Sequence, residues 1–360
     1  MTTIGVLGGG QLGRMLALAG YPLGMRFRFL DPAPDAPAGQ LAEHIAGQYS
    51  DFAALDRFAQ GVDVITYEFE NVPVEAVRFL EEKVGVYPPP VALSVSQDRF
   101  REKSAFNEHG IPTAPFEAVD TWEGLLAAIE RIELPSVLKT RRMGYDGKGQ
   151  MVLKSRGDAE SAWKELGGQP LILEGFVPFS RELSIISVRD RQGNTAFYPL
   201  VENHHRDGIL RLSLAPAPDL NSQLQAEAEG YAGRVLDALQ YVGVLAIELF
   251  QVEGGLLANE MAPRVHNSGH WTIEGAETSQ FENHLRAIAG LPLGATSMVG
   301  YSAMLNIIGE LPDEARVLAV PGAHLHLYGK APRPGRKLGH ITLRASDADT
   351  LRARLGALDE

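Results

Sequence analysis

Two glutamates in the segment VLAIELFQVEGGLLANEMAPR, residues 244–264, have a spacing that suits metal binding. Two apolar strands flank Gly254 and Gly255, which is typical of a hairpin, and Glu248 and Glu260 lie symmetrically about Gly254. A turn centred there places both carboxylates opposite each other on one face, which is unfavourable unless a cation separates them. Mg²⁺ takes carboxylate oxygens and completes its shell with phosphates and water, so the pair is a candidate magnesium site. A turn shifted by one residue would instead leave one glutamate exposed and the other at the edge of the core.

A glycine-rich, basic loop lies between two further apolar strands, in PSVLKTRRMGYDGKGQMVLK at residues 135–154. Glycines let backbone amides approach phosphate groups, and cations balance the phosphate charge. The loop lacks the Walker A spacing and joins two strands instead of opening a helix. An exposed basic hairpin would have the same composition. The glycines are Gly144, Gly147 and Gly149, and the cations are Lys139, Arg141, Arg142 and Lys148.

Two polar stretches follow in the C-terminal third. A cation and neutral donors beside a metal site suit a small oxyanion such as bicarbonate or an acyl phosphate. A basic cluster in an acidic protein suits a substrate phosphate. Each stretch would equally serve as a solvated polar loop. The first stretch contains Arg264, His266, Asn267, His270 and Trp271, and the second contains Lys330, Arg333, Arg336 and Lys337.

The N-terminal segment IGVLGGGQLGRM suggests a different chemistry. Gly8, Gly10 and Gly13 have the G-x-G-x-x-G spacing with which dinucleotide-binding domains approach a pyrophosphate. The next apolar run ends in Asp31, where such domains place the carboxylate that binds a ribose. Alone, this motif indicates an NAD-linked oxidoreductase.

The elements that must position these residues follow a clear order. Alternating strand and helix patterns over the first hundred residues predict a parallel sheet with ligands beyond its carboxyl ends. Prolines at 88–90 mark a connection. A helix over SQDRFREKSAFNEHG follows, capped by Ser96 or Asp98 and ended by Gly110. A smaller α+β unit, a helix over 222–239, the hairpin, and short antiparallel strands with a final helix complete the chain.

Composition narrows the class of protein. A chain of 360 residues is long enough for about two or three domains, and 45% hydrophobic with 22% charged residues is typical of soluble globular proteins. The absence of cysteine excludes disulfides, zinc–thiolate sites and cysteine nucleophiles. Neither an apolar run of about 18 residues nor a signal peptide is evident, so we expect a cytoplasmic enzyme that is not bound to membranes. A net charge of −12 argues against nucleic-acid binding.

Taken together, these motifs resemble the ATP-grasp superfamily and, within it, the N5-carboxyaminoimidazole ribonucleotide synthetase family of bacterial and fungal purine biosynthesis. The likeness covers nearly the whole chain, and the combination of YDGKGQ with HNSGHWT is its most specific part. The resemblance implies a mixed α/β and α+β ATP-grasp fold. It divides into a Rossmann-like parallel-sheet domain (1–95), an ATP-grasp domain (96–300) with a lid subdomain at about 110–178, and a small β-rich C-terminal domain (301–360).

The resemblance also implies a role for individual residues. The ATP phosphates would be contacted by Arg99 and Lys139 under a loop of Gly144, Tyr145, Asp146, Gly147, Lys148, Gly149 and Gln150. Adenine would bind the strand of Glu174, Gly175, Phe176 and Val177, with Glu182 on the ribose and His205 near the nucleotide. Magnesium, as two ions, would be held by Glu248 and Glu260 with Asn259 beside them. Bicarbonate and the carboxyphosphate made from it would face Arg264, His266 and Asn267, with Lys139 completing the catalytic set. The aminoimidazole ribonucleotide would be surrounded by Gln11, Leu12, Glu68, Tyr145, Asn267, Lys330, Arg336 and Lys337.

The implied activity is an ATP- and bicarbonate-dependent ligase that carboxylates 5-aminoimidazole ribonucleotide, working as a homodimer with a downstream mutase acting on its product. In this interpretation the first glycine turn faces the ribonucleotide and Asp31 has no cofactor role. Two residues depart from the pattern: Met143 stands where many relatives have glycine, which would stiffen the phosphate loop, and Ala262 stands where the wider superfamily often has a metal-binding asparagine. The alternatives are a formate-dependent glycinamide ribonucleotide transformylase, an NAD-linked oxidoreductase, and a nucleotide-binding sensor without activity.

Overall fold

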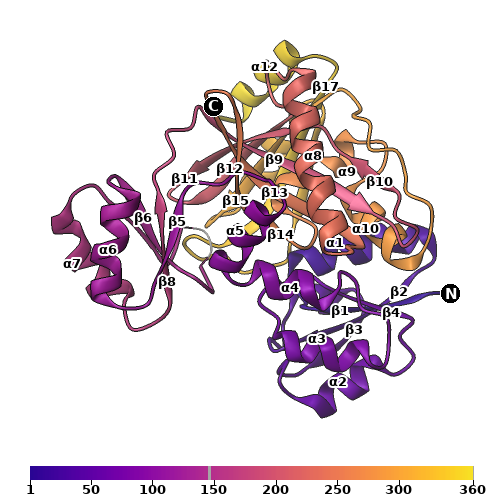
Figure 1. Ribbon diagram of the computed structural model, residues 1–360. Coiled ribbons are helices and arrows are strands. Elements are labelled where there is room, and N and C mark those ends of the chain that lie inside the picture. Colours follow the sequence, from indigo (N-terminus) through magenta and orange to yellow (C-terminus); the bar gives the residue numbers. More distant parts are fainter. Residues whose placement is uncertain (145–146, 360) are drawn as a thin grey trace.

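The computed structural model describes residues 1–144 and 147–359, and these form three β-sheets with helices packed on them (Figure 1). In Figure 1 the N-terminal sheet lies at the lower right, a small four-stranded unit projects to the left, and a nine-stranded sheet occupies the upper centre. No helix of the described part of the chain has the length and apolarity needed to span a membrane.

The N-terminal sheet is parallel with strand order β3-β2-β1-β4, as the alternating pattern predicts. Its strands are β1 (Thr3–Leu7), β2 (Arg26–Asp31), β3 (Glu43–Ala46) and β4 (Val64–Tyr67). Its helices are α1 (Gln11–Gly20), η1 (Tyr21–Leu23), η2 (Pro37–Gln40), α2 (Phe52–Ala59) and α3 (Val74–Glu81). β4 is buried throughout, whereas the edge strand β3 is short and partly exposed, which explains why the sequence pattern did not reveal it.

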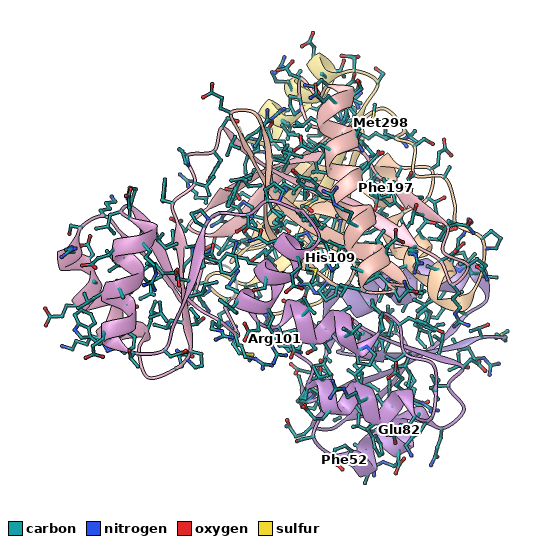
Figure 2. The ribbon with its side chains drawn as sticks, in the orientation of Figure 1. Phe52, Glu82, Arg101, His109, Phe197 and Met298 are labelled. Carbon is teal, nitrogen blue, oxygen red and sulfur yellow. The ribbon has the colours of Figure 1, made fainter. Side chains whose placement is uncertain are left out.

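Two short helices connect this sheet to the rest of the chain. The predicted connection at residues 88–90 is in part a helix start, because Pro90 is the first residue of α4 (Pro90–Ser96), where its missing N–H costs nothing. Of the two predicted caps for α5 (Arg99–Glu108), Asp98 is the one used: its carboxylate accepts from the amides of Phe100 and Arg101. Figure 2 labels Arg101 and His109 near the two ends of α5, at the centre of the molecule.

The small unit is a four-stranded antiparallel sheet of order β5-β8-β6-β7 with two helices. Its elements are β5 (Phe116–Val119), α6 (Trp122–Ile132), β6 (Ser136–Thr140), β7 (Gln150–Leu153), α7 (Arg156–Leu166) and β8 (Leu171–Gly175). Leu125 and Ile129 of α6 and Ala159 and Ala162 of α7 pack on Leu138 in a core of their own.

The large sheet runs β14-β13-β9-β11-β12-β15-β17-β16, with β10 pairing β9. Its strands are β9 (Arg181–Arg189), β10 (Thr195–Phe197), β11 (Val201–Arg206), β12 (Ile209–Ala215), β13 (Gly243–Val252), β14 (Gly255–Ala262), β15 (Tyr301–Ile308), β16 (Ala323–Leu327) and β17 (Lys337–Ala345). The accompanying helices are α8 (Ser222–Ala238), η3 (Asn267–Gly269), α9 (Thr272–Gly275), α10 (Gln280–Ala289), α11 (Glu314–Ala319) and α12 (Ala348–Asp359). The C-terminal strands extend this sheet directly, because β15 pairs with β12, as in Leu305 opposite Leu212. The division at residues 95 and 300 stays a prediction.

Candidate active site

The hairpin β13–β14 brings Glu248 and Glu260 opposite each other, but not for the reason the sequence suggests. Its turn is centred between Glu253 and Gly254, half a residue before the predicted centre, because Val252 pairs with Gly255, and this moves the pairing of the two strands by one residue. The register then shifts by one residue beside Glu248, where Asn259 is an extra residue in β14 and forms a β-bulge. Without the bulge, the pairing from the turn would set Asn259 opposite Glu248 and send Glu260 to the other face of the sheet. The bulge therefore creates the facing pair.

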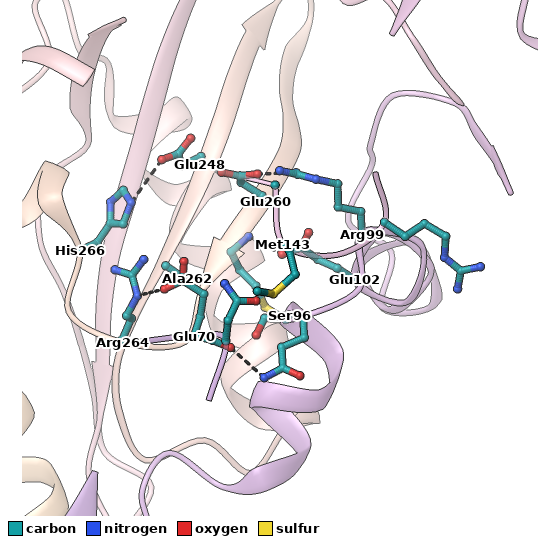
Figure 3. Close-up of a pocket in the computed structure, with 15 residues that line it drawn as sticks. Glu70, Ser96, Arg99, Glu102, Met143, Glu248, Glu260, Ala262, Arg264 and His266 are labelled. Atoms are coloured by element: carbon teal, nitrogen blue, oxygen red, sulfur yellow. Dashed lines mark hydrogen bonds and ion pairs between the residues drawn. The ribbon is translucent and has the colours of Figure 1, made fainter. Parts of the chain in front are cut away.

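Both carboxylates line the cavity drawn in Figure 3, together with Arg99, Arg264 and His266. Each carboxylate has a cationic or polar partner on its outer side. Arg99 Nη1 lies 2.5 Å from Glu260 Oε2, and His266 Nε2 lies 3.4 Å from Glu248 Oε1. Burial raises the pKa of Glu248, and the negative charge of Glu260 raises it further. Burial has the same effect on Glu260, but the charge and hydrogen bond of Arg99 hold its pKa below the usual value. Two carboxylates are thus held close together with only one of them paired to an arginine, which is an arrangement that a divalent cation would stabilise.

Asn259 strengthens the case for a metal site at this pair. Its side-chain Oδ1 is buried and has no hydrogen-bond partner among the described residues. An unpartnered buried oxygen on the residue that precedes Glu260 is a donor of the kind that Mg²⁺ accepts in addition to carboxylates. The residues present therefore fit the predicted ion.

A buried ion-pair cluster lies next to the facing glutamates, with Arg99 close to both Glu260 and Glu174. Glu174 Oε2 accepts from Lys139 Nζ at 2.9 Å and lies 3.3 Å from Lys103 Nζ. Burial alone would raise the pKa of Glu174, but the two lysine charges, Lys139 first, lower it to about 2. Burial lowers the pKa of Lys139. The predicted residue Lys139 thus belongs to a buried ion-pair cluster that also contains Lys103, which the sequence did not single out and whose side chain is only 1% exposed.

The predicted adenine-binding segment, residues 174–177, already uses part of its backbone in hydrogen bonds within the protein. The amides of Gly175 and Phe176 already donate to the carbonyls of Pro115 and Pro135, at 2.8 and 3.2 Å. These two donors are thus not free for adenine in this structure. Val177 follows at the end of the same segment, where its carbonyl accepts from the amide of Phe179.

Glu182 and His205 lie together on β9 and β11, with His205 Nδ1 2.9 Å from Glu182 Oε2. Burial alone would lower the pKa of His205, but the hydrogen bond to Glu182 and the charge of Glu248 raise it. The predicted ribose carboxylate and the predicted nucleotide histidine are thus direct neighbours, on the side of the sheet that carries Glu248.

Part of the basic loop is fixed to the start of α5. Arg141 forms two hydrogen bonds with Asp98, at 3.1 and 3.0 Å, and Arg142 donates to Gln97 at 2.8 Å. These two cations therefore anchor the loop and are not directed at a phosphate. Met143 has φ +62° and is 66% exposed, so it occupies the left-handed region that favours glycine.

The remaining described residues of the loop include two glycines in a tight turn. Gly147 and Gly149 also have positive φ, 74° and 71°, as a tight glycine turn requires. Gly144 lines the cavity next to Glu260, and Lys148 lies on the exposed side of the loop. Gln150 begins β7 opposite Lys139. The predicted residues Tyr145 and Asp146 lie outside the described residues.

The stretch after β14 divides between the cavity and the core. Arg264 pairs through Nε with Glu70, and His266 lies between Glu248 and Ser268. Burial, then the charges of Arg264 and Lys337, lower the pKa of His266 to about 3, so its ring is neutral near pH 7. The amide of Ser268 donates to His266 Nδ1, which leaves the ring proton on Nε2 beside Glu248.

Asn267 is the second orphaned amide side chain of the region. Both of its side-chain polar atoms are buried without a partner among the described residues. By contrast, Trp271 packs at 88° against Tyr198, and His270 lies against His340, so both have structural positions in the core. In this stretch Arg264 and His266 therefore line the cavity, whereas His270 and Trp271 belong to the core.

The N-terminal glycine turn is occupied by the protein's own carboxylates. Glu68 accepts from the amides of Gly10 and Gly13, at 3.0 and 3.4 Å, and Asp31 accepts from the amide of Gly9 at 2.7 Å. These are the donors that a dinucleotide pyrophosphate would need. The turn is thus braced from within, and Asp31, which the sequence left without a role, is one of its braces.

The predicted ribonucleotide residues gather beside this turn. Lys330 Nζ donates to Gln11 Oε1 at 2.5 Å. Arg336 donates to the carbonyl of Ala331 at 3.2 Å, and Lys337 begins β17 close enough to lower the pKa of His266 by its charge. Leu12 differs from the others because its side chain is 6% exposed and belongs to the core, so only its backbone can reach a ligand.

Comparisons with known proteins agree with this geometry. Family models match the ribonucleotide synthetase preATP-grasp domain over residues 1–97, the ATP-grasp domain over 104–281, and the phosphoribosylaminoimidazole carboxylase C-terminal domain over 302–354. The N5-carboxyaminoimidazole ribonucleotide synthase of Pseudomonas aeruginosa is 60% identical over 356 residues, covering 99% of this chain and 98% of that protein.

Solved structures give the same result. The N5-carboxyaminoimidazole ribonucleotide synthetase of Thermus thermophilus matches with a TM-score of 0.96 and 62% identity, covering 99% of this chain and 97% of that one. The Aspergillus clavatus enzyme, solved in complex with ADP and 5-aminoimidazole ribonucleotide, matches with a TM-score of 0.90 and 33% identity, covering 99% and 98%. The chain belongs to the N5-carboxyaminoimidazole ribonucleotide synthase family of ATP-grasp ligases.

Proposed function

We propose that this chain catalyses the ATP- and bicarbonate-dependent carboxylation of 5-aminoimidazole ribonucleotide to N5-carboxyaminoimidazole ribonucleotide in purine biosynthesis. The observation that carries the proposal is the facing pair of Glu248 and Glu260 in one cavity with Arg264 and His266. A metal-binding carboxylate pair flanked by a cation and a neutral histidine suits activation of a small oxyanion by ATP. Both the metal and bicarbonate are parts of this proposal.

Glu248 and Glu260, with Asn259 Oδ1 beside them, would hold Mg²⁺. When bound, the ion would neutralise charge on the ATP phosphates during transfer. The second predicted ion would have fewer protein ligands, because position 262 is an alanine.

Bicarbonate is a poor electrophile, and ATP overcomes this by placing its γ-phosphoryl group on a bicarbonate oxygen. Lys139 and Arg99 would offset the charge that develops as the bond to ADP breaks. The carboxyphosphate formed would lie against Arg264, the neutral His266 and the amide of Asn267. The exocyclic amine of the substrate then attacks the carboxyl carbon, either of carboxyphosphate or of carbon dioxide released from it. A C–N bond forms, phosphate leaves and the amine loses a proton.

The closed site must exclude water, because hydrolysis would waste the intermediate. Gln11, Lys330, Arg336 and Lys337 would bind the ribonucleotide beside the glycine turn.

We further propose that the protein is a cytoplasmic homodimer and that its labile product passes to a mutase.

Two rivals remain for the experiment to exclude. A formate-dependent glycinamide ribonucleotide transformylase would use the same ATP chemistry with formyl phosphate. An NAD-linked oxidoreductase would need the glycine amides that Glu68 and Asp31 occupy.

The test is ADP release by the purified protein with Mg·ATP and bicarbonate, with and without aminoimidazole ribonucleotide, and with formate plus glycinamide ribonucleotide in parallel. Strong stimulation by aminoimidazole ribonucleotide alone is the expected result. Stimulation by the formate pair alone would assign the protein to the rival family, and no turnover with either would favour a sensor.

A further inference from the structure

β14 is the edge strand of the large sheet, so the outward-facing backbone groups around its bulge have no partner within the sheet. A bulge interrupts the hydrogen-bond ladder, and buried backbone groups without partners are costly. At this bulge the carbonyl of Asn259 accepts from Lys103 Nζ at 3.1 Å, and the amide of Met261 donates to Glu102 Oε1 at 2.7 Å. The groups on either side of Glu260 are thus satisfied by two consecutive residues of α5.

Both side chains are buried, with Glu102 2% and Lys103 1% exposed. Charged side chains are rarely buried to this degree unless they are paired. Lys103 is paired with Glu174, and Arg99 reaches Glu260 itself from one turn earlier on the same helix. In Figure 3, Arg99 and Glu102 extend from α5 towards the strand that carries Glu260. One helix face therefore contacts the bulge at three successive points.

We propose that Glu102 and Lys103 are positioning residues that hold the β14 bulge and thereby keep Glu260 opposite Glu248 for metal binding. This inference rests on the proposed function, because it assumes that the facing pair binds a divalent cation. Neither side chain needs to touch the ion. Their effect passes through the backbone of Asn259 and Met261, which fixes the direction of the Glu260 side chain.

The experiment measures Mn²⁺ binding to the full chain in the presence of ADP, from the free Mn²⁺ signal in electron paramagnetic resonance. Glu102→Leu removes the acceptor of the Met261 amide, and Lys103→Met removes the donor to the Asn259 carbonyl. Each variant is expected to weaken Mn²⁺ binding about 10- to 100-fold, the usual cost of losing a group that orients a metal ligand. Glu102→Gln keeps an oxygen acceptor and should bind Mn²⁺ like the wild type.

Tyr231→Phe is the matched control. The Tyr231 hydroxyl donates to Glu227 Oε1 at 2.7 Å and lies 3.2 Å from the carbonyl of Leu256, at the other end of β14; Glu227 Oε1 in turn accepts from the Leu256 amide. Its loss removes a hydrogen bond at that end of the strand without touching the bulge, so Mn²⁺ affinity should not change. A general loss of stability would lower the active fraction in all variants but would not move the dissociation constant of the folded protein.

Folded Glu102→Leu with wild-type Mn²⁺ affinity would overturn the inference. If that variant does not fold, Glu102→Asp, which is one methylene shorter, serves the same test with the same two outcomes. Failure of the proposed function is a separate result: the wild type itself would then bind no Mn²⁺ with ADP, or Glu260→Gln would bind it unchanged.

Discussion

The N-terminal glycine turn and the β13–β14 hairpin each bring two carboxylates together, but their environments are opposite. Glu68 and Asp31 accept hydrogen bonds from the amides of the turn, so their charge is used to hold the backbone. Glu248 and Glu260 face each other across a bulge, and their partners lie only on the outer sides. The first arrangement is complete within the protein. The second leaves two neighbouring carboxylates with one arginine between them and the solvent, which fits the proposed metal site, and such local conflicts are expected at functional sites.

The largest expected effect comes from Glu260→Gln, which removes one of the two facing carboxylates of the β13–β14 hairpin. The carboxamide keeps the shape but not the charge that binds the metal. Since a catalytic metal contributes several kcal/mol to charge stabilisation, kcat should fall about 10²- to 10³-fold. The protein should remain folded, because relief of repulsion with Glu248 offsets loss of the Arg99 ion pair. Steady-state kinetics and circular dichroism test both parts, and turnover at the wild-type rate would remove Glu260 from the metal site.

Glu174→Gln tests the buried cluster beside that site. It leaves Lys103 buried without its counter-charge, which typically costs about 3–5 kcal/mol in the free energy of unfolding. Because the pKa of Glu174 is about 2 in the folded protein and its ordinary value is 4.5, the extra stability of the wild type over Glu174→Gln is fully present above pH 4.5. It should shrink as the pH falls from 4.5 towards 2.

Urea unfolding across that pH range measures the difference in the free energy of unfolding between the wild type and Glu174→Gln. Glu117→Gln, which breaks the exposed pair with Arg131 in the same small unit, is the control and should cost at most about 1 kcal/mol. If the difference in the free energy of unfolding between the wild type and Glu174→Gln stays constant down to pH 3, it contradicts the ion pairs assigned to Glu174.

Glu68→Gln removes one of the two carboxylates that brace the N-terminal glycine turn. Glutamine has a single acceptor oxygen, so one of the two amides of Gly10 and Gly13 loses its partner and faces an N–H group instead. The free energy of unfolding should fall by about 1–3 kcal/mol. The Mg²⁺ concentration for half-maximal activity should not change, in contrast to variants of the hairpin. A shifted Mg²⁺ dependence with unchanged stability would reverse the roles assigned to the two regions.

Met143→Gly should have the smallest effect. Met143 is held at φ +62°, which costs about 1–2 kcal/mol for a residue with a Cβ and little for glycine. Greater freedom of the unfolded chain opposes this gain, so stability should change by less than about 1 kcal/mol. If the strained residue slows loop closure, kcat should rise slightly, and stopped-flow measurement of ADP formation would detect it. A large loss of stability would show that the methionine side chain has a packing role.

The sequence predicted the parallel N-terminal sheet, the cap at Asp98 as one of two options, and the facing glutamates. These follow from periodicity, helix-start chemistry and symmetry about a glycine turn. The bulge could not be predicted, because an extra residue in a strand leaves no distinct side-chain pattern. The predicted strand pairing next to the turn was wrong by one residue, and the bulge compensated for the error.

The supporting residues were missed for a related reason. Glu102 and Lys103 lie in REKSAFNE, where charged residues look like a solvated helix face, and only tertiary structure shows that this face is buried. The bracing role of Glu68 also depends on a contact across 58 residues of chain. A clue was present in the spacing of Arg99, Glu102 and Lys103, which share one face of a helix.

The most direct test of the central claim is a crystal structure with Mn²⁺ and ADP, with the metal located by its anomalous scattering. The account predicts an anomalous peak between Glu248 and Glu260, coordinated by an oxygen of each, with Arg99 displaced from Glu260 towards the nucleotide. A nucleotide bound in the cavity with no metal at this pair, and with Arg99 still on Glu260, would contradict it.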